Sequence, residues 1–436
     1  MCYAIPGKVE TIDKNIAIID YFGQKKKAIN ELLSLVPGDY VYAQGGYVIQ
    51  KVKPHDAKEI LEAWQEMFVQ LQEVDAKIFR LSDKGAGENL KLRNILDKAC
   101  EGKALKNEDL EYLLNLKDPA EVELFLKAAN FLRQKYHQNA CCAHGIIEIS
   151  NYCRRGCTYC GISTHNGSLK RYRMSPDEIY SAVKEAVDVH GFKAIVLQSG
   201  EDPGYSIKEL AEIIREIKKR HAVLILISFG EIGIEGLKEL FGAGARGLLM
   251  RFETSNPELY RKTHSGQELE TRLEHIREAY KIGYLIITGG LVGLPGQTSK
   301  DIINDLFLAK ELNAEMFSFG PFLPHPNTPL AGSAVLEGDS ILKTLALARF
   351  VALPESKILV TTAFETLTPS AREQGLLAGA NSLMLNVTPL KYRALYSIYP
   401  KRAHELESID IQVKDVIMLL KSLGRVPTDL GISQGG

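Results

Sequence analysis

Residues 145–160 read GIIEISNYCRRGCTYC, and this stretch decides the fold of most of the chain. Its first six residues form a short apolar run, which is consistent with a strand buried on both faces of a parallel sheet. Cys153, Cys157 and Cys160 follow directly, with the spacing C-x3-C-x2-C. Three close cysteines on one loop indicate a site for a soft metal centre at the end of that strand.

Seven more apolar segments of strand length follow, and helical patterns lie between them. The segments are AIVLQS (194–199), VLILIS (223–228), GLLMRF (247–252), LIITGGLVG (285–293), EMFSFG (315–320), ILVTT (358–362) and SLMLN (382–386). Such alternation is typical of parallel α/β structure. Eight strands with seven intervening helices fit a closed barrel better than an open sheet. We therefore expect a fold of the α/β class, a (β/α)8 TIM-type barrel over residues 141–400.

The N-terminal part of the chain has a different pattern. Residues 1–52 contain short alternating segments separated by turn signals, which predict a small β-barrel. An amphipathic helix is predicted over residues 55–75, so this first domain should cover residues 1–78. The remaining parts are a linker over 79–92, a helical lead-in over 93–140 and a C-terminal helical extension over 401–436.

Composition and charge weigh against several classes of function. The chain has 436 residues, 45% of them hydrophobic, and a formal net charge of −1 from 53 basic and 54 acidic residues. Without a basic excess, nothing favours binding to nucleic acid or to an anionic membrane. No apolar run has the length of a membrane span, and the N-terminus lacks the features of a signal peptide. Six of the seven cysteines lie between positions 100 and 160, which suits a reducing cytoplasm better than a disulfide framework.

The cysteine triplet suits an iron–sulfur cluster. Three thiolates can hold three corners of a cubane and leave the fourth iron open for another ligand. A tetrahedral zinc site would need a fourth protein ligand, and His165 is five residues away, so zinc remains an alternative. The chain contains no cysteine after Cys160, which predicts a single cluster. Cys100 and the pair Cys141–Cys142 have no motif around them, and we expect them to be structural.

Polar residues and glycines recur at the ends of the predicted strands, where TIM barrels carry their active sites. They are Gln198, Gly200 and Glu201 after the second strand, Ser228 and Glu231 after the third, Arg251 and Glu253 at the fourth with Arg272 in the helix that follows, and Gly290 and Gly293 at the fifth. A buried Glu–Arg pair is more often structural than functional when it stands alone. Because these groups recur at successive strand ends beside the triplet, we expect one binding site at this end of the barrel.

The triplet, with Tyr159 before its last cysteine, resembles the motif of the radical S-adenosylmethionine (SAM) superfamily. Longer blocks, including IVLQSGEDP, RFETSNPELYRK, VGLPGQT and GPFLPHPNTPLA, resemble the HydE family of FeFe-hydrogenase maturases over about residues 85–425. Methylornithine synthase and biotin synthase are related to that family. The resemblance implies a 4Fe–4S cluster on the three cysteines, and cleavage of SAM to a 5′-deoxyadenosyl radical.

The same resemblance suggests roles for individual side chains. Glu253 and Arg272 look like contacts to SAM, and Gly290 and Gly293 look like the lining of its adenosine site. The other residues expected at the cofactor are Tyr159, Gly200, Glu201, Glu231 and Arg251, and those expected at the substrate are Gln198, Ser228, Thr361, Thr362, Tyr392 and Tyr396. His144 stands where the family often carries an arginine that grips the substrate, so substrate anchoring is expected to differ here.

The first 75 residues resemble the HypC/HupF family of small NiFe-hydrogenase assembly chaperones. The match begins with MCYAIPGKV (1–9) and includes PGDYV (37–41) and GYVIQ (46–50). In that family a cysteine at position two helps to carry an iron unit with carbonyl and cyanide ligands, which makes Cys2 a candidate metal ligand. Gln44 stands where the family commonly has a histidine, so a docking module without iron is the alternative.

The expected function is that of a HydE-like radical SAM enzyme acting on a small substrate that contains iron or sulfur. Two alternatives remain open at this point: a radical SAM enzyme with an amino-acid substrate, as in methylornithine synthase or biotin synthase, and a non-catalytic carrier of an iron complex. The expected partners are hydrogenase-maturation proteins and an electron donor such as ferredoxin or flavodoxin. Neither nucleic acid nor a membrane is expected as a partner.

Overall fold

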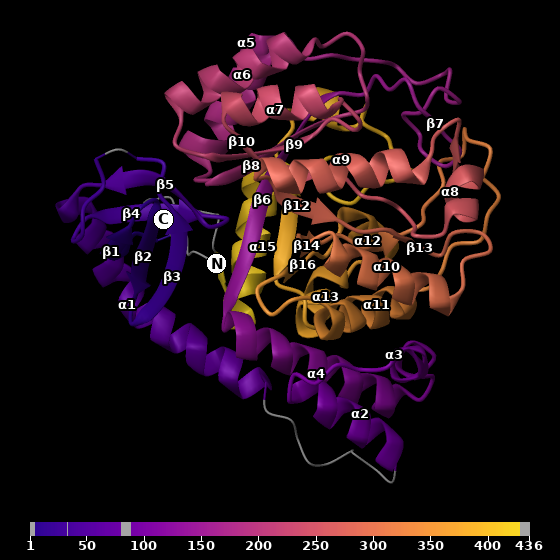
Figure 1. The fold of residues 1–436 in the computed structure, drawn as a ribbon, viewed down its shortest axis with the longest axis horizontal. Coiled ribbons are helices and arrows are strands. Elements are labelled where there is room, and N and C mark those ends of the chain that lie inside the picture. Colours follow the sequence, from indigo (N-terminus) through magenta and orange to yellow (C-terminus); the bar gives the residue numbers. More distant parts are fainter. Residues whose placement is uncertain (1–4, 33, 80–88, 428–436) are drawn as a thin grey trace.

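The computed structural model describes residues 5–32, 34–79 and 89–427, and it contains two barrels of different size. In Figure 1 the small barrel carries the indigo strands, and the large barrel occupies the rest of the picture above a group of helices. No described helix is long and apolar enough to cross a membrane.

The small barrel is closed by five short strands. They are β1 (Gly7–Asp13), β2 (Ile16–Tyr21), β3 (Gln24–Ile29), β4 (Tyr40–Gln44) and β5 (Tyr47–Val52), arranged in the order β1-β2-β3-β5-β4 with β1 paired back to β4. Every second side chain points inward, so Val9, Ile19 and Val41 form its core. Helix α1 (Pro54–Phe79) packs on this core through Trp64 and Leu71. The predicted small β-barrel with a C-terminal helix is confirmed.

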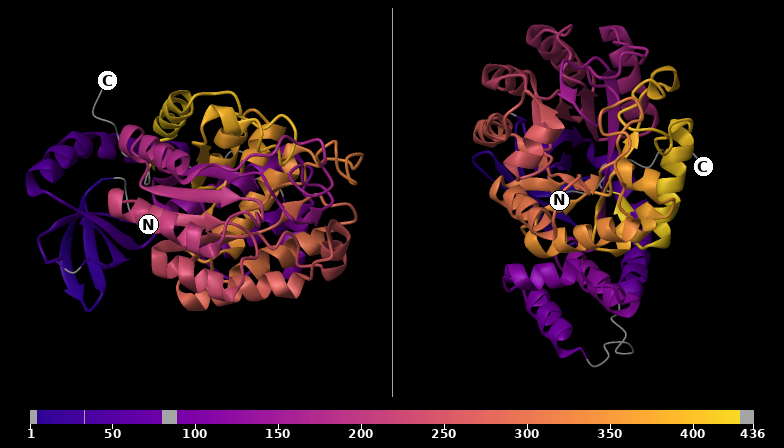
Figure 2. Two further views of the ribbon diagram at one scale, coloured as in Figure 1. Left: turned by 90° about the horizontal axis from the view of Figure 1, so that it is seen from above. Right: turned by 90° about the vertical axis from the view of Figure 1, so that its right-hand side faces the viewer.

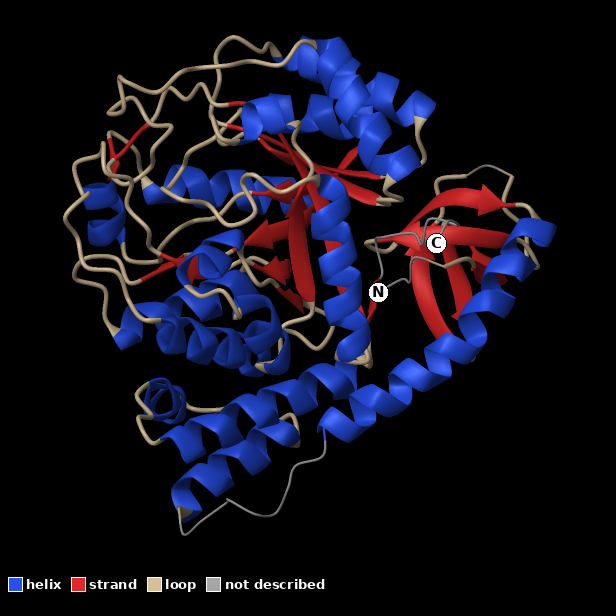
Figure 3. Cartoon of the chain, turned by 180° about the vertical axis from the view of Figure 1, so that it is seen from behind, coloured by secondary structure: helices blue, strands red, loops and turns tan. Residues whose placement is uncertain are grey.

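Eight parallel strands form the large barrel. They are β6 (Ala140–Ser150), β8 (Ala194–Ser199), β9 (Leu224–Ser228), β10 (Ala245–Leu249), β12 (Leu285–Thr288), β14 (Ala314–Phe317), β16 (Lys357–Ile358) and β17 (Ser382–Asn386). The sheet runs in the order β16-β14-β12-β10-β9-β8-β6-β17, and a parallel bridge from Leu359 to Ser382 joins its two end strands. The predicted TIM-type architecture is therefore confirmed (Figure 3).

Helices cover the outside of this barrel. The crossover helices are α5 (Pro176–Lys184), which continues into the π-helix η1 (Glu185–Val189), α6 (Ile207–Arg220), α7 (Ile234–Ala243), α8 (Pro257–Thr263), α9 (Leu269–Ile282), α10 (Ser299–Glu311), α11 (Gly338–Val351), α12 (Thr362–Leu367) and α13 (Ala371–Leu377). Side-chain caps set several of their starts; Ser175 and Thr298 each form a capping box with the acidic residue three positions later.

The parts before and after the large barrel pack on its N-terminal end and its flank. Helices α2 (Leu90–Cys100), α3 (Asn107–Leu114) and α4 (Pro119–His137) precede β6, and α2 begins inside the stretch expected to be a linker. After the barrel come α14 (Leu390–Arg393), α15 (Ile409–Ser422) and the short strand β18 (Val426–Pro427). The sequence suggested a purely helical C-terminal extension, but this segment also contains β18, which pairs with the start of β6.

Four of the predicted strands end earlier than expected, among them ILVTT (358–362), of which only Ile358 lies in β16. GLLMRF (247–252) is regular only as far as Leu249, and LIITGGLVG and EMFSFG are each split in two, giving β13 (Leu291–Val292) and β15 (Gly320–Pro321) as separate short strands that pair with each other. Gly289 and Gly290 form the break in LIITGGLVG, and Gly320 begins the short strand after the break in EMFSFG. The residues beyond each break leave the barrel wall and turn across its open end, where they contribute to the site described below.

The small barrel docks on the N-terminal end of the large one. Tyr47 and Ile49 of β5 pack in one apolar cluster with inward-facing residues of the large barrel, among them Leu224 and Leu226. The Tyr47 hydroxyl donates a hydrogen bond to the Gly283 carbonyl over 3.2 Å. Seen from above in Figure 2, the small barrel lies at one end of the molecule and the loops after the large-barrel strands lie at the other.

A buried charged cluster joins α1, α4 and the C-terminal segment. Arg133 of α4 donates to the Asp75 carboxylate of α1 at 2.8 and 2.9 Å, and Arg425 lies 3.1 Å from the same carboxylate. All three side chains are at most 2% exposed. An added Cβ at Gly424 would meet the Asp75 backbone nitrogen at 2.3 Å, so α1 packs directly on the backbone there. The small barrel is thus fixed at two separate places.

Candidate active site

The three cysteines of the triplet line one cavity at the C-terminal end of the large barrel. Of the residues expected in the site, the lining includes Cys153, Cys157, Cys160, Tyr159, Gln198, Gly200, Glu201, Ser228, Arg251, Glu253, Arg272 and Tyr396. These side chains come from the ends of six different segments that are far apart in the sequence. The expectation of a single site at this end of the barrel therefore agrees with the geometry.

Glycines allow the cysteine loop to pack closely on its neighbours. An added Cβ at Gly200, after β8, would meet the Tyr152 carbonyl oxygen at 2.3 Å and the Cβ of Cys153 at 2.6 Å. At Gly161, directly after the triplet, an added Cβ would meet the Ser397 carbonyl oxygen at 2.0 Å. A side chain at either position would push the loop away from the barrel.

A short two-stranded ladder holds the middle of the loop. Gly156–Cys157 forms β7, which pairs antiparallel with β11, His264–Ser265. The Thr158 N–H also donates to the Thr263 carbonyl over 2.9 Å. The segment after α8 therefore fixes the backbone of the cysteine loop on both sides of Cys157.

The cysteines are half-buried, and this partial removal from water affects the protonation of their thiols. Burial raises the pKa of Cys157 to about 12, and it raises the pKa of Cys160 further. Without a metal both thiols are therefore neutral, and metal binding must displace their protons. Among the described residues, no three His, Cys, Asp or Glu side chains converge closely enough to hold a single metal ion. Cluster cysteines each bind a different iron, so this spacing fits a cubane better than one zinc ion.

The zinc alternative also lacks its fourth ligand. His165 is exposed, and its Nε2 atom forms a hydrogen bond with the Gly156 carbonyl over 3.1 Å. The imidazole is thus used to stabilise the turn of the loop.

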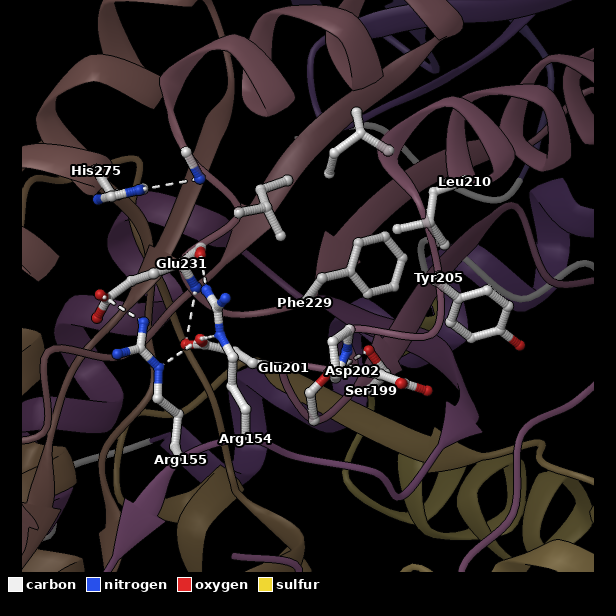
Figure 4. Close-up of a pocket in the computed structure, with 15 residues that line it drawn as sticks. Arg154, Arg155, Ser199, Glu201, Asp202, Tyr205, Leu210, Phe229, Glu231 and His275 are labelled. Atoms are coloured by element: carbon white, nitrogen blue, oxygen red, sulfur yellow. Dashed lines mark hydrogen bonds and ion pairs between the residues drawn. The ribbon is translucent and has the colours of Figure 1, made fainter. Parts of the chain in front are cut away.

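An alternating set of arginines and glutamates surrounds the cysteine loop. Arg155 ion-pairs with both Glu201 and Glu231, the latter at 2.9 Å, and Arg272 lies 3.3 Å from Glu231. Figure 4 shows Arg154 and Arg155 pointing toward the two carboxylates, in a hollow of about 440 Å³ behind the loop. Glu201 and Glu231 are therefore held by arginines and position the loop, and of the two Glu201 also lines the cavity.

Glu253 has an unusual backbone conformation. Its φ angle is 69°, in the left-handed region that side chains other than glycine rarely adopt. Its N–H donates to the Gly289 carbonyl over 3.1 Å, and its carbonyl accepts from the Leu291 N–H over 2.8 Å. These bonds hold the carboxylate in the cavity, where it is 3.2 Å from Arg251. Burial raises its pKa, against the opposing effect of Arg251 and Arg272. Strain of this kind is often found at functional sites.

The two glycines expected at the adenosine have different surroundings. Gly290 pairs with Glu253 in a parallel bridge, and an added Cβ there would meet the Glu253 carbonyl oxygen at 2.7 Å. Gly293 lies farther along the same segment, where its N–H donates to the Gln297 Oε1 over 2.7 Å. It lines a separate hollow on the outside of the barrel, together with Leu294 and Pro295.

The expected substrate residues are also divided. Gln198, Ser228 and Tyr396 line the cavity, and Thr361 caps α12 at its edge by accepting a hydrogen bond from the Phe364 N–H. Thr362 is the first residue of that helix, and its neighbour Ala363 lines the cavity.

Two other expected residues lie elsewhere. The Tyr392 hydroxyl donates to Glu178 over 2.5 Å, and its ring stacks on Tyr172 with a 4.6 Å separation of centroids. His144 lies deep in β6, in register with Met384 of β17, and is 5% exposed. Cys2 lies outside the described residues.

Several cavity residues were missed by the sequence analysis. They include Arg155, His264, Leu291, Pro321, Leu323, Ile398 and Tyr399. Arg155 lies inside the triplet motif, and Tyr399 follows Tyr396 by three residues, so both could have been inferred from position. His264 had no such signal: it enters the cavity because β11 pairs with β7, and its Nε2 lies 3.0 Å from the Tyr159 hydroxyl.

Comparison with known proteins decides the family. A family model for the radical SAM superfamily matches residues 147–309. The "[FeFe] hydrogenase maturase subunit HydE" of Thermotoga maritima is 41% identical over 335 residues, which are 77% of this chain and 95% of that protein. The chain belongs to the HydE family of radical SAM proteins. Its first 64 residues match the HupF/HypC family model, so this HydE-family chain also carries a HupF/HypC module.

Other relatives share the barrel. The 3-methylornithine synthase of Methanosarcina acetivorans is 30% identical over 336 residues, 76% of this chain and 93% of that protein. The crystal structure of methylornithine synthase (PylB) superposes with a TM-score of 0.67 at 28% identity, covering 76% of this chain and 97% of that one. The HydG maturase of Carboxydothermus hydrogenoformans has the same TM-score at 19% identity, and it supports the fold alone.

Membership of the radical SAM superfamily implies a 4Fe–4S cluster and SAM, and the cavity residues fit both. Three half-buried thiols face one space, as a cluster with one open iron requires. Beside them, Glu253 and Arg272 offer a carboxylate and a guanidinium suited to the ammonium and carboxylate of SAM. The chain is therefore a radical SAM enzyme of the HydE family.

Proposed function

We propose that this protein is a HydE-like maturase that acts on a small substrate containing iron and sulfur, on the way to a hydrogenase-type metal cofactor. The observation that carries the proposal is the near-complete coverage of the Thermotoga maritima HydE at 41% identity, together with three thiols on one cavity. That relative is a hydrogenase maturase, which suggests the hydrogenase context. The cavity residues suggest the radical chemistry.

Each group of cavity residues has a proposed task. Cys153, Cys157 and Cys160 hold the cluster, which together with SAM supplies one-electron cleavage of SAM and a 5′-deoxyadenosyl radical. Glu253 and Arg272 orient SAM through its ammonium and carboxylate. The residues that would face the substrate are Gln198, Ser228, Thr361, Thr362 and Tyr396. Apolar groups at Leu291, Pro321 and Ile398 exclude water from the space where the radical acts.

The small barrel has a separate proposed task. Cys2 is our candidate iron ligand, but its domain docks on the end of the large barrel away from the cluster loop. Apolar residues such as Leu224, Leu226 and Ile287 fill the large barrel at that end. We therefore propose that any iron complex on Cys2 is exchanged with a separate maturation protein, and does not pass along the barrel axis. The alternative task is docking alone.

An electron donor and a location also follow from the chemistry. The cluster needs an electron, and we propose that a small ferredoxin or flavodoxin donates it. A reducing cytoplasm is the proposed location, because the cluster thiolates must stay reduced before the metal binds.

The test begins with SAM cleavage. Anaerobically reconstituted protein with dithionite should release 5′-deoxyadenosine, and Cys157→Ala should reduce that release to the uncatalysed background. Cys100→Ala is the matched control: Cys100 lies on α2 before the barrel, half-buried, and its loss should leave the release unchanged. Equal loss from both substitutions, or none from either, would contradict the assignment.

A second assay separates the substrate classes. In a cell-free maturation of FeFe-hydrogenase from which HydE is omitted, adding this protein should restore hydrogenase activity. If it cleaves SAM but restores none, an amino-acid substrate becomes the better proposal, as the likeness to 3-methylornithine synthase would favour. If it cleaves no SAM while holding iron, the non-catalytic carrier replaces both.

A further inference from the structure

Gln267 lies beside one of the three cluster thiols. Its amide Nε2 donates to Cys157 Sγ over 3.9 Å, a long hydrogen bond to sulfur, and the residue is 5% exposed. Gln267 follows the short strand β11, and its own N–H donates to the His264 carbonyl over 3.0 Å. Since β11 pairs with β7, which contains Cys157, the ladder fixes the distance between the amide and the sulfur.

The orientation of this amide is determined by its surroundings. The Gln267 Oε1 atom is buried and has no hydrogen-bond partner among the described residues. Reversing the amide would bring this oxygen against Cys157 Sγ, which becomes an anionic thiolate when it binds iron, and the two would repel. The observed orientation instead gives the thiolate a donor. A buried amide that leaves its oxygen unpaired in order to face a sulfur needs an explanation beyond packing.

The three thiols receive different kinds of donor. Backbone N–H groups of Arg155 and Glu201 approach Cys153, and the N–H of Ile162 approaches Cys160. At Cys157 the donor is the side chain of Gln267. Only this donor can be removed by substitution without changing the backbone of the cysteine loop.

We propose that Gln267 is a positioning residue that raises the reduction potential of the cluster. A hydrogen bond to a ligating sulfur stabilises the reduced, more negative form of an iron–sulfur cluster more than the oxidised form. Electron delivery from a weak biological reductant thereby becomes easier. The inference rests on the cluster that radical SAM membership implies, and it is independent of the substrate proposed above.

The test is an EPR-monitored redox titration of the reconstituted protein, without SAM or substrate. Gln267→Leu removes the donor at nearly constant volume, and Gln267→Glu replaces it with a carboxylate of the same shape. At a fixed potential the ratio of reduced to oxidised cluster should fall about tenfold in Gln267→Leu, which is about 59 mV for a one-electron couple. The fall should be at least as large in Gln267→Glu.

A matched control comes from an exposed glutamine. Gln374→Leu removes an amide from the outer helix α13 and should leave the ratio unchanged. Iron content and thermal midpoint, measured on all four proteins, confirm that the cluster is loaded in each. A ratio in both Gln267 variants equal to that of the wild type would overturn the proposal. Because the titration uses no SAM, its outcome does not depend on whether the protein matures a hydrogenase.

Discussion

Tyr392 and Tyr396 are four residues apart in the sequence, but their hydroxyl groups have different surroundings. Tyr396 is 2% exposed and lines the cavity, close to Cys153 and Cys160. Tyr392 points to the outside of the barrel, where its hydroxyl donates a hydrogen bond to Glu178 and Lys391 pairs with the same carboxylate at 2.6 Å. The two tyrosines therefore have different roles, although the sequence analysis expected both of them at the substrate.

This difference predicts separate effects of removing each hydroxyl group. Tyr392→Phe should leave release of 5′-deoxyadenosine unchanged and lower the free energy of unfolding by about 0.5–1.5 kcal/mol, the usual contribution of one hydrogen bond. Tyr396→Phe should change turnover with substrate by at least several-fold. Urea unfolding and a turnover assay on both variants check this; a turnover defect in Tyr392→Phe but not in Tyr396→Phe would contradict it.

At the scale of elements, the C-terminal extension is tied to the first barrel strand. Arg402 pairs with the buried carboxylate of Glu148 on β6 and donates to the Tyr396 carbonyl over 2.6 Å. Asn386 of β17 donates to the same carboxylate over 3.0 Å. Arg402 thereby links Tyr396, which lines the cavity, to β6, so the segment after β17 holds Tyr396 in place.

Breaking this pair from either side should be costly. Arg402→Gln leaves Glu148 buried without its cation, and the free energy of unfolding should fall by about 3–5 kcal/mol. Adding Glu148→Gln to that variant removes the unpaired buried charge, so the double variant should recover part of the lost free energy of unfolding. Chemical denaturation of the single variants and the double variant gives the coupling energy; strictly additive losses would show that the two side chains do not interact.

The elements were predicted better than the residues that close the site. The barrel strands and the small β-barrel followed from apolar runs and alternation, because those patterns reflect burial on one or both faces. The early end of β10 was not visible, since Met250–Arg251–Phe252 continues an apolar pattern while Glu253 takes a left-handed conformation. The pairing of β11 with β7 was also missed: it joins segments about 100 residues apart and has only two residues on each side. His264 and Gln267 entered the site through that pairing.

At the scale of the whole molecule, the two barrels form one unit. The turn between β4 and β5 enters the N-terminal end of the large barrel, where an added Cβ at Gly45 would meet Leu285 at 2.8 Å and Leu224 at 2.9 Å. On the side, Arg246 pairs with Glu31 at 2.8 Å. With the buried cluster at Asp75, these contacts should make the barrels unfold together. This docking could not be predicted from the sequence, because an apolar pattern shows which side chains are buried and not which other domain covers them.

Gly45 offers a direct test of the docking. Gly45→Ala should lower the thermal midpoint more than Gly23→Ala, since both glycines have a positive φ but only Gly45 has atoms of the large barrel within reach of a new Cβ. The variant at Gly23 measures the backbone strain alone, and the difference between them measures the contact, about 1–3 kcal/mol. Differential scanning calorimetry should show a single transition in the wild type; two well-separated transitions would mean that the barrels are independent.

The central claim is that Cys153, Cys157 and Cys160 hold a cubane with one iron open to SAM. EPR of the dithionite-reduced, anaerobically reconstituted protein tests it most directly, with spectra recorded before and after SAM is added. We predict a 4Fe–4S signal whose g-values shift on addition of SAM in the wild type and in Cys100→Ala, and no such signal in Cys157→Ala. A signal that SAM leaves unchanged, in protein that is folded and fully loaded with iron, would contradict it.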